Sequence, residues 1–387
     1  MTTNKNHNSP NVPNLRFPEF EGEWEKHLLT DFMSFKNGMN PEAKRFGNGV
    51  KFISVMDILN NQFIYYDNIR ASVEIADGDL DTYGVKYGDI LFQRSSETLE
   101  DVGQANVYLD SKPAVFGGFV IRGKSKGNYN PLFFRYLLTS PTVRKRVIVK
   151  GAGAQHFNIG QDGLSKVCID IPCIKEQEKI ARLLALLDER IATQNKIIED
   201  LKKLKSAISE RLFKSVKGSI VLLSDICDIV KGKQINGENL SERGRYYVMN
   251  GGTEPSGYYD DYNVEANTIS ISEGGNSCGY VQFNTFPFWS GGHCYSIQNV
   301  TGNVDNLYLY HYLKSNEDNI MKLRIGSGLP NIQKKDLAMF KIIVPTLEQQ
   351  MTISTFLSSI ERKAEIERRI QNAIQKQKLY LLQQMFI

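Results

Sequence analysis

The sequence contains few cysteines, and their spacing excludes the usual cysteine-rich frameworks. The five cysteines are an odd number and include no Cys-x-x-Cys pair; they are Cys168, Cys173, Cys227, Cys278 and Cys294. The five histidines show no metal-ligand spacing either. This pattern is typical of reduced thiols rather than of disulfides or a zinc site. We therefore predict no metal site and a cytoplasmic location.

Long apolar runs are also missing. No stretch approaches the roughly 20 consecutive apolar residues of a membrane span. Residues 1–14 are rich in Asn, Pro and Thr and lack an apolar segment, which predicts a disordered leader rather than a signal peptide. We expect a soluble protein with no membrane partner.

Signs of catalytic chemistry are weak. Residues 130–133, Asn-Pro-Leu-Phe, lack the second proline of the Asn-Pro-Pro-aromatic motif of adenine methyltransferases, so they predict a helix start. Residues 361–363, Glu-Arg-Lys, lie in a helical heptad pattern, which indicates a surface charge run rather than a nuclease motif. We predict no P-loop for ATP, no catalytic residue and no cofactor.

Composition permits several classes of partner. A chain of 387 residues with 41% hydrophobic residues is expected to form two or more domains with a real core. The net charge of +4 is mildly basic. Such a charge permits a nucleic-acid partner but does not indicate one, because DNA binding needs clustered charge.

What the sequence does contain is an internal repeat. Residues 127–140 align with residues 302–315 at an offset of 175 positions, and residues 28–32 resemble residues 222–226. The offset of 175 also aligns Gly151 with Gly326 and Gly153 with Gly328. Residues 154–157 then align with only two residues, 329–330, so the second copy is shorter by two, and the offset is 173 from there on. Chance does not supply such a collinear series, so we predict two copies of one unit.

Each copy is expected to begin with a globular part, over residues 15–171 and 219–343. Short β-prone runs separated by turn residues predict strands near 50–55, 89–93, 115–122, 268–272 and 293–298. Helical periodicity is present only near 131–149 and 307–324. The pattern predicts an α+β fold of two similar globular domains, each with a mostly antiparallel or barrel-like sheet.

A long helix is expected after each globular part, because Pro172 and Pro345 mark positions where a helix can begin. Apolar residues then alternate by four and three, which is the heptad seam of a coiled coil. Polar residues interrupt both seams at equivalent places, Gln194 and Glu367, then Lys205 and Lys378. The apolar seam residues are Ile180, Leu184, Leu187, Ile191, Ile198, Leu201, Ile208 and Leu212 in the first helix, and Ile353, Leu357, Ile360, Ile374, Leu381 and Met385 in the second.

A helix of about 38 residues is about 57 Å long. One interpretation is an ordinary helical hairpin between domains, or an oligomerisation coil. The other is a spacer in which the two helices pair antiparallel within one chain and hold the globular parts apart. Two equivalent helices in one chain favour the second interpretation, because their effective concentration is high.

The chain resembles the specificity subunits of type I restriction–modification systems over nearly its whole length. The resemblance is carried by residues 15–24 (LRFPEFEGEW), 88–96 (GDILFQRSS) and 251–262 (GGTEPSGYYDDY), and by the junctions after Pro172 and Pro345. The junctions differ by an apparent slip, with Glu176-Gln177 in the first and Glu348-Gln349-Gln350 in the second.

The resemblance implies two target-recognition domains, joined by helical regions, that bind a bipartite double-stranded DNA target. It also implies partners, namely two modification (methyltransferase) subunits and, in the full complex, restriction (motor-nuclease) subunits. The implied domains are a leader (1–14), target-recognition domain 1 (15–171), a central helical spacer (172–218), target-recognition domain 2 (219–343) and a C-terminal helical spacer (344–387).

Candidate DNA contacts in the first globular part lie after a β-prone run, in a basic segment, and in the loop that follows it. Arg and Gln suit guanine and adenine edges, whereas Ser and Lys suit phosphates. The alternative is a solvated loop end and a charged helix face. The candidates are Gln93, Arg94, Ser95, Ser96, Arg144, Lys145, Arg146, Lys150, Gln155 and His156.

The second globular part offers a basic turn, a polar loop with glycines, and the counterpart of the first glycine turn. Tyrosines at 258, 259 and 262 favour packing over base stacking. The candidates are Lys231, Lys233, Gln234, Ser272, Glu273, Asn276, Ser277, Arg324, Ser327 and Asn331.

Apolar residues on the flanks of the helices are candidates for docking the modification subunits, or else they pack against the adjacent globular parts. They are Leu183, Ile197, Phe213, Phe356, Ile370 and Phe386. The leading hypothesis is a non-catalytic, sequence-specific DNA-binding subunit that directs adenine methylation and ATP-dependent restriction by its partners. The alternative is a protein-binding adaptor with two repeated heads on a coiled coil, which the salt dependence of DNA binding would distinguish.

Overall fold

The computed structural model describes residues 11–326, 328 and 330–387. The first ten residues of the predicted leader therefore lie outside the description. The chain divides into two compact units: unit 1 comprises the described residues up to Thr193 together with Gln371–Ile387, and unit 2 comprises Gln194–Ile370. The long helices α6 (Ile174–Ser215) and α11 (Leu347–Gln384) contribute residues to both units.

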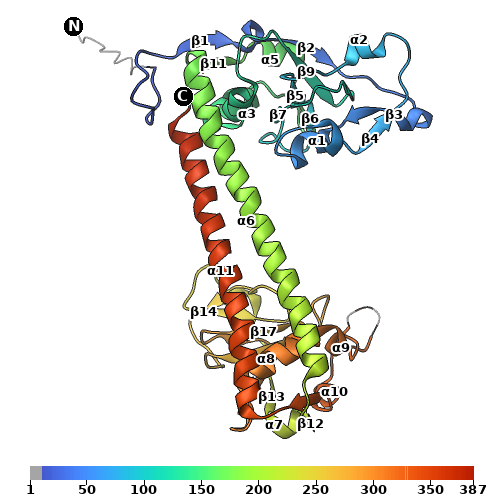
Figure 1. The fold of residues 1–387 in the computed structure, drawn as a ribbon, viewed down its shortest axis with the longest axis vertical. Coiled ribbons are helices and arrows are strands. Elements are labelled where there is room, and N and C mark those ends of the chain that lie inside the picture. Colours follow the sequence, from blue (N-terminus) through green and yellow to red (C-terminus); the bar gives the residue numbers. More distant parts are fainter. Residues whose placement is uncertain (1–10, 327, 329) are drawn as a thin grey trace. The chain divides into compact units, whose positions relative to one another are not determined.

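Unit 1 combines short strands, short helices and the ends of the two long helices (Figure 1). Its strands are β1 (Glu25–Leu28), β2 (Met33–Asn37), β3 (Phe46–Ile53), β4 (Ala71–Val73), β5 (Ile90–Gln93), β6 (Ser95–Ser96), β7 (Ala105–Val107), β8 (Val115–Phe116), β9 (Val120–Ser125), β10 (Phe157–Asn158) and β11 (Cys168–Ile171). Its short helices are α1 (Val55–Asn60), α2 (Asp79–Tyr83), α3 (Pro131–Thr139), α4 (Pro141–Ile148) and α5 (Gln161–Ser165).

Unit 2 is built in the same way from fewer elements. Its strands are β12 (Ser219–Leu222), β13 (Asp228–Lys231), β14 (Tyr246–Met249), β15 (Tyr258–Tyr259), β16 (Thr268–Ser272), β17 (Val281–Asn284), β18 (Trp289–Ser290), β19 (Cys294–Gln298) and β20 (Lys341–Val344). Its short helices are α7 (Leu223–Ile226), α8 (Asn306–Ser315), α9 (Glu317–Met321) and α10 (Lys334–Ala338).

The sheets of the two units have the same topology. Unit 1 has a four-stranded sheet in the order β2-β9-β5-β7 and a three-stranded sheet β4-β3-β8; unit 2 has β13-β19-β16-β17 and β15-β14-β18. The ladders β1-β11 and β12-β20 also correspond. Pairing is antiparallel except for β3 with β8 and β14 with β18. The predicted repeat is therefore a repeat of the fold, and the predicted α+β class with two similar domains and paired long helices is confirmed.

Three elements that were predicted to be continuous are interrupted. The helix expected over 131–149 is two helices, because Ser140 ends α3 and its side chain caps α4, in which Pro141 is the first residue. The helix expected over 307–324 likewise divides into α8 and α9 at Asn316. The strand expected over 115–122 is divided into β8 and β9 by Gly117 and Gly118.

The glycine alignment predicted from the repeat was wrong by two positions. Ala152 and Asn158 exchange two backbone hydrogen bonds of 2.9 Å, and Ile325 and Asn331 exchange the equivalent pair of 2.8 and 3.0 Å. Ala152 therefore corresponds to Ile325, and the two loops have equal length. The contraction lies earlier in the repeat, because α4 in unit 1 has eight residues and its counterpart α9 in unit 2 has five.

A buried glutamine ties the start of each long helix to a short helix. The Gln177 side-chain oxygen accepts the backbone N–H of Asn130, the residue that caps α3, at 3.0 Å, and its amide donates to the Pro172 carbonyl oxygen at 3.0 Å. Gln350 makes the equivalent bonds with Asp305 (2.8 Å) and Pro345 (2.9 Å). The slip expected between the junctions is therefore absent, because Gln177 and Gln350 occupy one structural position.

The long helices pair antiparallel within each unit (Figure 1). In unit 1 the Lys378 ammonium pairs with the Asp188 carboxylate. In unit 2 Lys205 pairs with Glu361, and Gln194 donates to the side chain of Glu367. The polar residues that interrupt the seam thus find partners across it. The predicted apolar seam residues are all buried or partly buried.

Each unit has its own core, to which both long helices contribute. In unit 1 Trp24 packs edge-on against Phe133 and Phe386, with ring centroids 6.1 and 6.3 Å apart. In unit 2 Phe213 packs against Tyr308 and other residues of α8. No helix in the described part of the chain combines the length and the apolar character needed to cross a membrane.

Candidate nucleic-acid interface

Two of the predicted DNA-binding segments of unit 1 lie against each other. β6 pairs antiparallel with β10, and the Ser95 hydroxyl hydrogen-bonds to the Asn158 side chain. The backbone N–H of Ile159 donates to the Arg94 carbonyl oxygen at 2.9 Å. The fold thus gathers the predicted contacts at 94–96 and at 155–156. We call residues 94–96 and 152–158 the first loop cluster.

The equivalent segments of unit 2 meet in the same way. Gly274 forms a β-bridge with Asn331, and the backbone N–H of Ile332 donates to the Glu273 carbonyl oxygen at 2.8 Å. This bond corresponds to the one between Ile159 and Arg94 in unit 1. We call residues 273–277 and 325–331 the second loop cluster, of which residues 327 and 329 lie outside the description.

Each loop cluster is joined to a Gly-Gly turn that the sequence analysis did not single out. The backbone N–H of Arg94 donates to the Phe119 carbonyl oxygen at 2.9 Å, and that of Glu273 donates to the His293 carbonyl oxygen at 2.9 Å. A Gly-Gly pair precedes Phe119 and another precedes His293. Arg94 and Glu273 are therefore structural counterparts, and the recurring Gly-Gly pair was the signal available in the sequence.

Several predicted contacts of unit 1 have partners within the fold. Gln93 was expected to lie after a β-prone run as a DNA contact, but it is the last residue of β5, is buried, and donates to the Ser95 carbonyl oxygen at 2.8 Å. The Arg144 guanidinium donates to two backbone carbonyl oxygens at 2.7 and 2.8 Å, and burial lowers its pKa. Arg146 pairs with Asp170 at 2.7 Å.

The other predicted contacts of unit 1 remain accessible to a ligand. Lys145 and Lys150, on or just after α4, are exposed, as are Gln155 and His156 in the first loop cluster. Arg94, Ser95 and Ser96 are partly buried.

In unit 2 the predicted polar loop starts with two buried side chains. The Ser272 hydroxyl donates to the Gly251 carbonyl oxygen at 2.6 Å. The Glu273 carboxylate accepts from the Lys231 ammonium at 2.6 Å and from the Tyr295 hydroxyl at 3.1 Å. Lys231 thereby holds Glu273 at the base of the second loop cluster.

The remaining predicted contacts of unit 2 are accessible, with the exception of Ser327, which lies outside the described residues. The exposed ones are Lys233, Gln234, Asn276, Arg324 and Asn331, and Ser277 is partly buried.

The tyrosines of the 251–262 segment make mainly packing contacts. The Tyr259 ring lies edge-on to Trp289 with centroids 5.2 Å apart, and the Tyr262 ring lies 4.8 Å from that of Tyr246. Tyr258 is 37% exposed.

The expectation that the sequence lacks the P-loop pattern Gly-x-x-x-x-Gly-Lys-Ser/Thr was wrong, because residues 118–125 read GFVIRGKS. A P-loop, however, connects a strand to a helix, so that backbone N–H groups can surround phosphate oxygens. Here Gly123, Lys124 and Ser125 belong to β9, which pairs with β2 and β5. A Cβ on Gly123 would lie 2.4 Å from the Met33 sulfur atom. The glycine therefore serves packing between strands.

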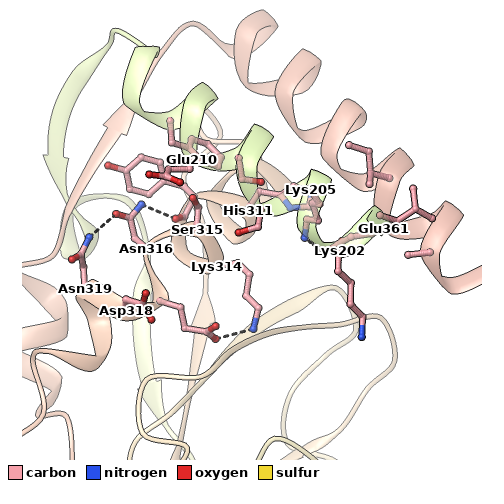
Figure 2. Close-up of a pocket in the computed structure, with 18 of the residues that line it drawn as sticks. Lys202, Lys205, Glu210, His311, Lys314, Ser315, Asn316, Asp318, Asn319 and Glu361 are labelled. Atoms are coloured by element: carbon pink, nitrogen blue, oxygen red, sulfur yellow. Dashed lines mark hydrogen bonds and ion pairs between the residues drawn. The ribbon is translucent and has the colours of Figure 1, made fainter. Parts of the chain in front are cut away.

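A cavity of about 1050 Å³ in unit 2 lies between α6, α11 and the α8–α9 segment (Figure 2). Lys314 pairs with Glu317 at 2.8 Å in its lining, and Lys205 pairs with Glu361. The buried His311 lies with Nε2 2.9 Å from the Ser358 hydroxyl oxygen, and burial lowers the pKa of His311 to about 4. In this lining the neutral imidazole joins α8 to α11, whereas the Lys314 pair joins α8 to α9 and the Lys205 pair joins α6 to α11.

No group of three or more His, Cys, Asp or Glu side chains is placed to hold a metal ion among the residues that the structure describes. The Asn130 side chain accepts from the Phe133 N–H at 2.9 Å, so residues 130–133 start a helix, as predicted.

The structure divides the predicted docking residues of the long helices. Phe213 and Phe386 are buried in the two cores, and Leu183 is partly buried against the unit 1 core. These three residues follow the packing interpretation. Ile197, Phe356 and Ile370 are exposed.

The start of α11 forms an apolar groove. Leu347, Met351 and Phe356 line it and are about half exposed, and Glu348 and threonine and serine side chains complete the lining. We call Leu347, Met351 and Phe356 the α11 groove.

Two solved structures from type I restriction–modification systems share this arrangement of elements. The type I restriction–modification S subunit from M. genitalium matches with a TM-score of 0.64 and 18% sequence identity, over 97% of this chain and 99% of that chain. A chain from a structural description of complex assembly and conformational transition of the type I R-M system matches with a TM-score of 0.57 and 14% identity, over 93% and 96%. These matches show a shared fold.

The family follows from the sequence. The family model for the type I restriction modification DNA specificity domain matches twice, over residues 21–203 and 218–376. A protein of Methanocaldococcus jannaschii described as the type I restriction enzyme MjaX specificity subunit is 25% identical over 95% of this chain and 94% of its own length. This chain belongs to the type I restriction–modification specificity subunit family.

Proposed function

We propose that this chain is the sequence-specific DNA-binding subunit of a type I restriction–modification complex, and that each unit recognises one half of a bipartite duplex site. The proposed target-recognition domains are residues 15–171 and 219–343, with helical spacers at 172–218 and 344–387. The chain directs adenine methylation and ATP-dependent restriction by its partner subunits and has no catalytic residue of its own. It acts in the cytoplasm, which its free cysteines suit.

The observation that best supports this proposal is that Arg94 in unit 1 and Glu273 in unit 2 are structural counterparts. Their backbone hydrogen bonds to a Gly-Gly turn and to a following loop are the same, yet one side chain is a cation and the other an anion. An arginine suits the O6 and N7 acceptors of guanine, whereas the Glu273 carboxylate is buried and paired with Lys231, so unit 2 offers no arginine at this position. A shared frame that carries an arginine in one unit and a buried carboxylate in the other supports recognition of two different half-sites.

Exposed cations beside each loop cluster support backbone contacts. Lys145 and Lys150 lie on or after α4 in unit 1. In unit 2 Arg324 directly precedes residue 325 of the second loop cluster, and the backbone N–H of Lys233 donates to the carbonyl oxygen of Ser290, the residue before the Gly-Gly turn, at 2.8 Å. Lysine and arginine contacts to phosphates fix the position of a protein on the duplex but carry no sequence information.

The long helices supply the surface for two modification subunits, and the restriction subunits complete the full complex. The α11 groove supports this proposal, because a row of half-exposed apolar side chains on a helix favours a protein partner.

Binding of the chain, in complex with its methyltransferase partner, to labelled duplexes tests the proposal. A library of random duplexes should yield a bipartite sequence that is preferred by at least about a thousandfold over unrelated DNA. Affinity should fall steeply with added salt, because binding to phosphates releases counterions. Equal affinity for all duplexes, or binding that is insensitive to salt, would contradict the proposal and favour a protein-binding adaptor.

A further inference from the structure

The two Gly-Gly turns are locked by close backbone packing. A Cβ on Gly38 would lie 2.1 Å from the Gly117 carbonyl oxygen, and a Cβ on Gly232 would lie 2.2 Å from the Gly291 carbonyl oxygen. The two turns are thus held by the same glycine-to-glycine contact. Such contacts exclude every larger residue and fix the turn in place.

The turns also bond to their sheets in the same way. Gly117 donates to the Ile53 carbonyl oxygen at 3.0 Å, and Gly291 donates to the Met249 carbonyl oxygen at 2.8 Å. Because these bonds anchor each turn to the buried end of a strand, β3 or β14, the residue that follows the glycines projects from a rigid base.

That projecting residue carries an exposed ring in both units. Phe119 is 69% exposed, although its neighbours Phe116 and Val120 are fully buried. The His293 side chain is 62% exposed, and it is followed by the buried Cys294. Single exposed apolar residues are common on protein surfaces. Here, however, the same turn exposes a ring twice, and each time beside a loop cluster.

Each ring lies next to the residue at the start of its loop cluster, Arg94 in unit 1 and its counterpart Glu273 in unit 2. The Arg94 guanidinium donates to the Gly118 carbonyl oxygen at 3.3 Å, directly before Phe119. His293 Nδ1 lies 3.6 Å from the Glu273 carboxylate. A ligand that reaches Arg94 in the first loop cluster, or the exposed Asn276 and Asn331 in the second, therefore meets the ring as well.

We propose that Phe119 and His293 are base-contacting residues, one for each half-site, whose rings lie against the bases of the bound duplex. This inference rests on the proposed function. Phe119 has no hydrogen-bonding group, so its contact is apolar: it packs against a thymine methyl group or stacks at an opened base step. His293 adds a ring nitrogen that can donate to or accept from a base edge.

The first test measures binding of the complex to a labelled duplex that carries the site defined by adenine-methylation mapping. Phe119→Ala should weaken binding about tenfold or more, since contacts between aromatic rings and bases are strong. It should also reduce the penalty for scrambling one half-site while leaving the penalty for the other half unchanged. His293→Ala should do the same for the opposite half.

The matched control is Tyr87→Ala. Tyr87 is 60% exposed and lies before β5, whereas Arg94 lies after its other end. This control should bind as the unchanged complex does. Phe119→Trp keeps a ring at the turn and should retain binding, and its fluorescence should change when the duplex is added. Equal thermal unfolding of the variants shows that the fold is intact.

Two modified duplexes distinguish the kinds of contact. Replacing thymine by uracil in the affected half-site removes the methyl group, and 2-aminopurine reports an opened base step by increased fluorescence. In the unchanged complex, either the uracil duplex should bind more weakly or the 2-aminopurine fluorescence should rise. Phe119→Ala should abolish that response.

The inference is overturned if Phe119→Ala and His293→Ala bind and discriminate as the unchanged complex does, or if Tyr87→Ala is equally weakened. Failure of the unchanged complex to prefer any duplex would instead overturn the proposed function, so the two failures are distinguishable.

Discussion

Lys378 pairs with Asp188 in unit 1 at the position where Lys205 pairs with Glu361 in unit 2. Both members of the first pair lie 173 positions from their counterparts in the second. The first pair takes its lysine from α11, and the second takes its lysine from α6. When two equivalent helices pair antiparallel, the helix that supplies the lysine at one end supplies the carboxylate at the other, and this is the arrangement of the two pairs.

Removal of the Asp188 carboxylate should destabilise unit 1. The carboxylate also accepts the Tyr136 hydroxyl at 2.7 Å, so Asp188→Ala leaves a mostly buried ammonium and a hydroxyl without their acceptor. We expect the free energy of unfolding of unit 1 to fall by about 2 kcal/mol. The chain has two tryptophans, Trp24 in unit 1 and Trp289 in unit 2. Denaturant unfolding followed by Trp24 fluorescence in a Trp289→Phe background therefore measures unit 1.

The matched variant is Glu361→Ala, whose carboxylate accepts the Tyr310 hydroxyl at 3.0 Å. It should lower the stability that Trp289 reports in a Trp24→Phe background. A loss below about 0.5 kcal/mol in both units would contradict the assigned role of the pairs.

The junction glutamines should be intolerant of truncation. Gln177→Ala leaves the Asn130 N–H and the Pro172 carbonyl oxygen without their side-chain partner in a buried place. We expect the free energy of unfolding to fall by about 1–3 kcal/mol, and the same for Gln350→Ala in unit 2. Denaturant unfolding measures both variants. The exposed neighbour Gln349 is the control, and Gln349→Ala should change stability by less than about 0.5 kcal/mol.

The buried His311 should make unit 2 less stable in acid. Burial lowers the pKa of His311 from 6.5 to about 4. The unfolded chain therefore binds a proton between these values while the folded chain does not, so stability is present above pH 6.5 and is lost as pH falls towards 4. The loss between pH 7 and pH 4 should be about 3 kcal/mol greater in the unchanged chain than in His311→Asn. Unfolding followed by Trp289 measures it, and parallel pH profiles for the two chains would refute this prediction.

The α11 groove should be required for the modification subunit. Met351 and Phe356 are about half exposed, and a carboxylate in their place would have to lose its hydration on docking. Phe356→Asp should weaken association with the methyltransferase subunit at least about tenfold in a sedimentation or titration experiment. Phe286, in the loop after β17, is more exposed than Phe356 (70% against 48%), and Phe286→Asp is the control that should associate normally. Unchanged association of the Phe356 variant would place docking elsewhere.

Periodicity and repetition predicted most of the architecture. The seam residues and the two helix-starting prolines predicted α6 and α11, because a 3.5-residue apolar repeat specifies a helix and its partner face. The break at Ser140 was missed because helical periodicity continues across it, although the capping serine and Pro141 were visible. The glycine alignment failed because α4 and α9 differ in length, and an offset taken from sequence cannot locate a deletion inside a helix.

The candidate site was predicted only in part. The loops at 94–96 and 155–156 were expected to matter, and the β6–β10 ladder brings them together. Which arginines have partners within the fold could not be predicted, since Arg144 and Arg146 bond to groups distant in sequence. Phe119 and His293 were missed because their significance lies in the turn that precedes them.

Whether each unit recognises one half-site can be measured by mapping adenine methylation in cells that express this chain with its methyltransferase partner. We predict one motif made of two specified halves separated by a constant, unspecified gap, and an Arg94→Ala variant should relax one half only. A single continuous motif, no motif, or loss of both halves through one unit would contradict the assignment of one half-site to each unit.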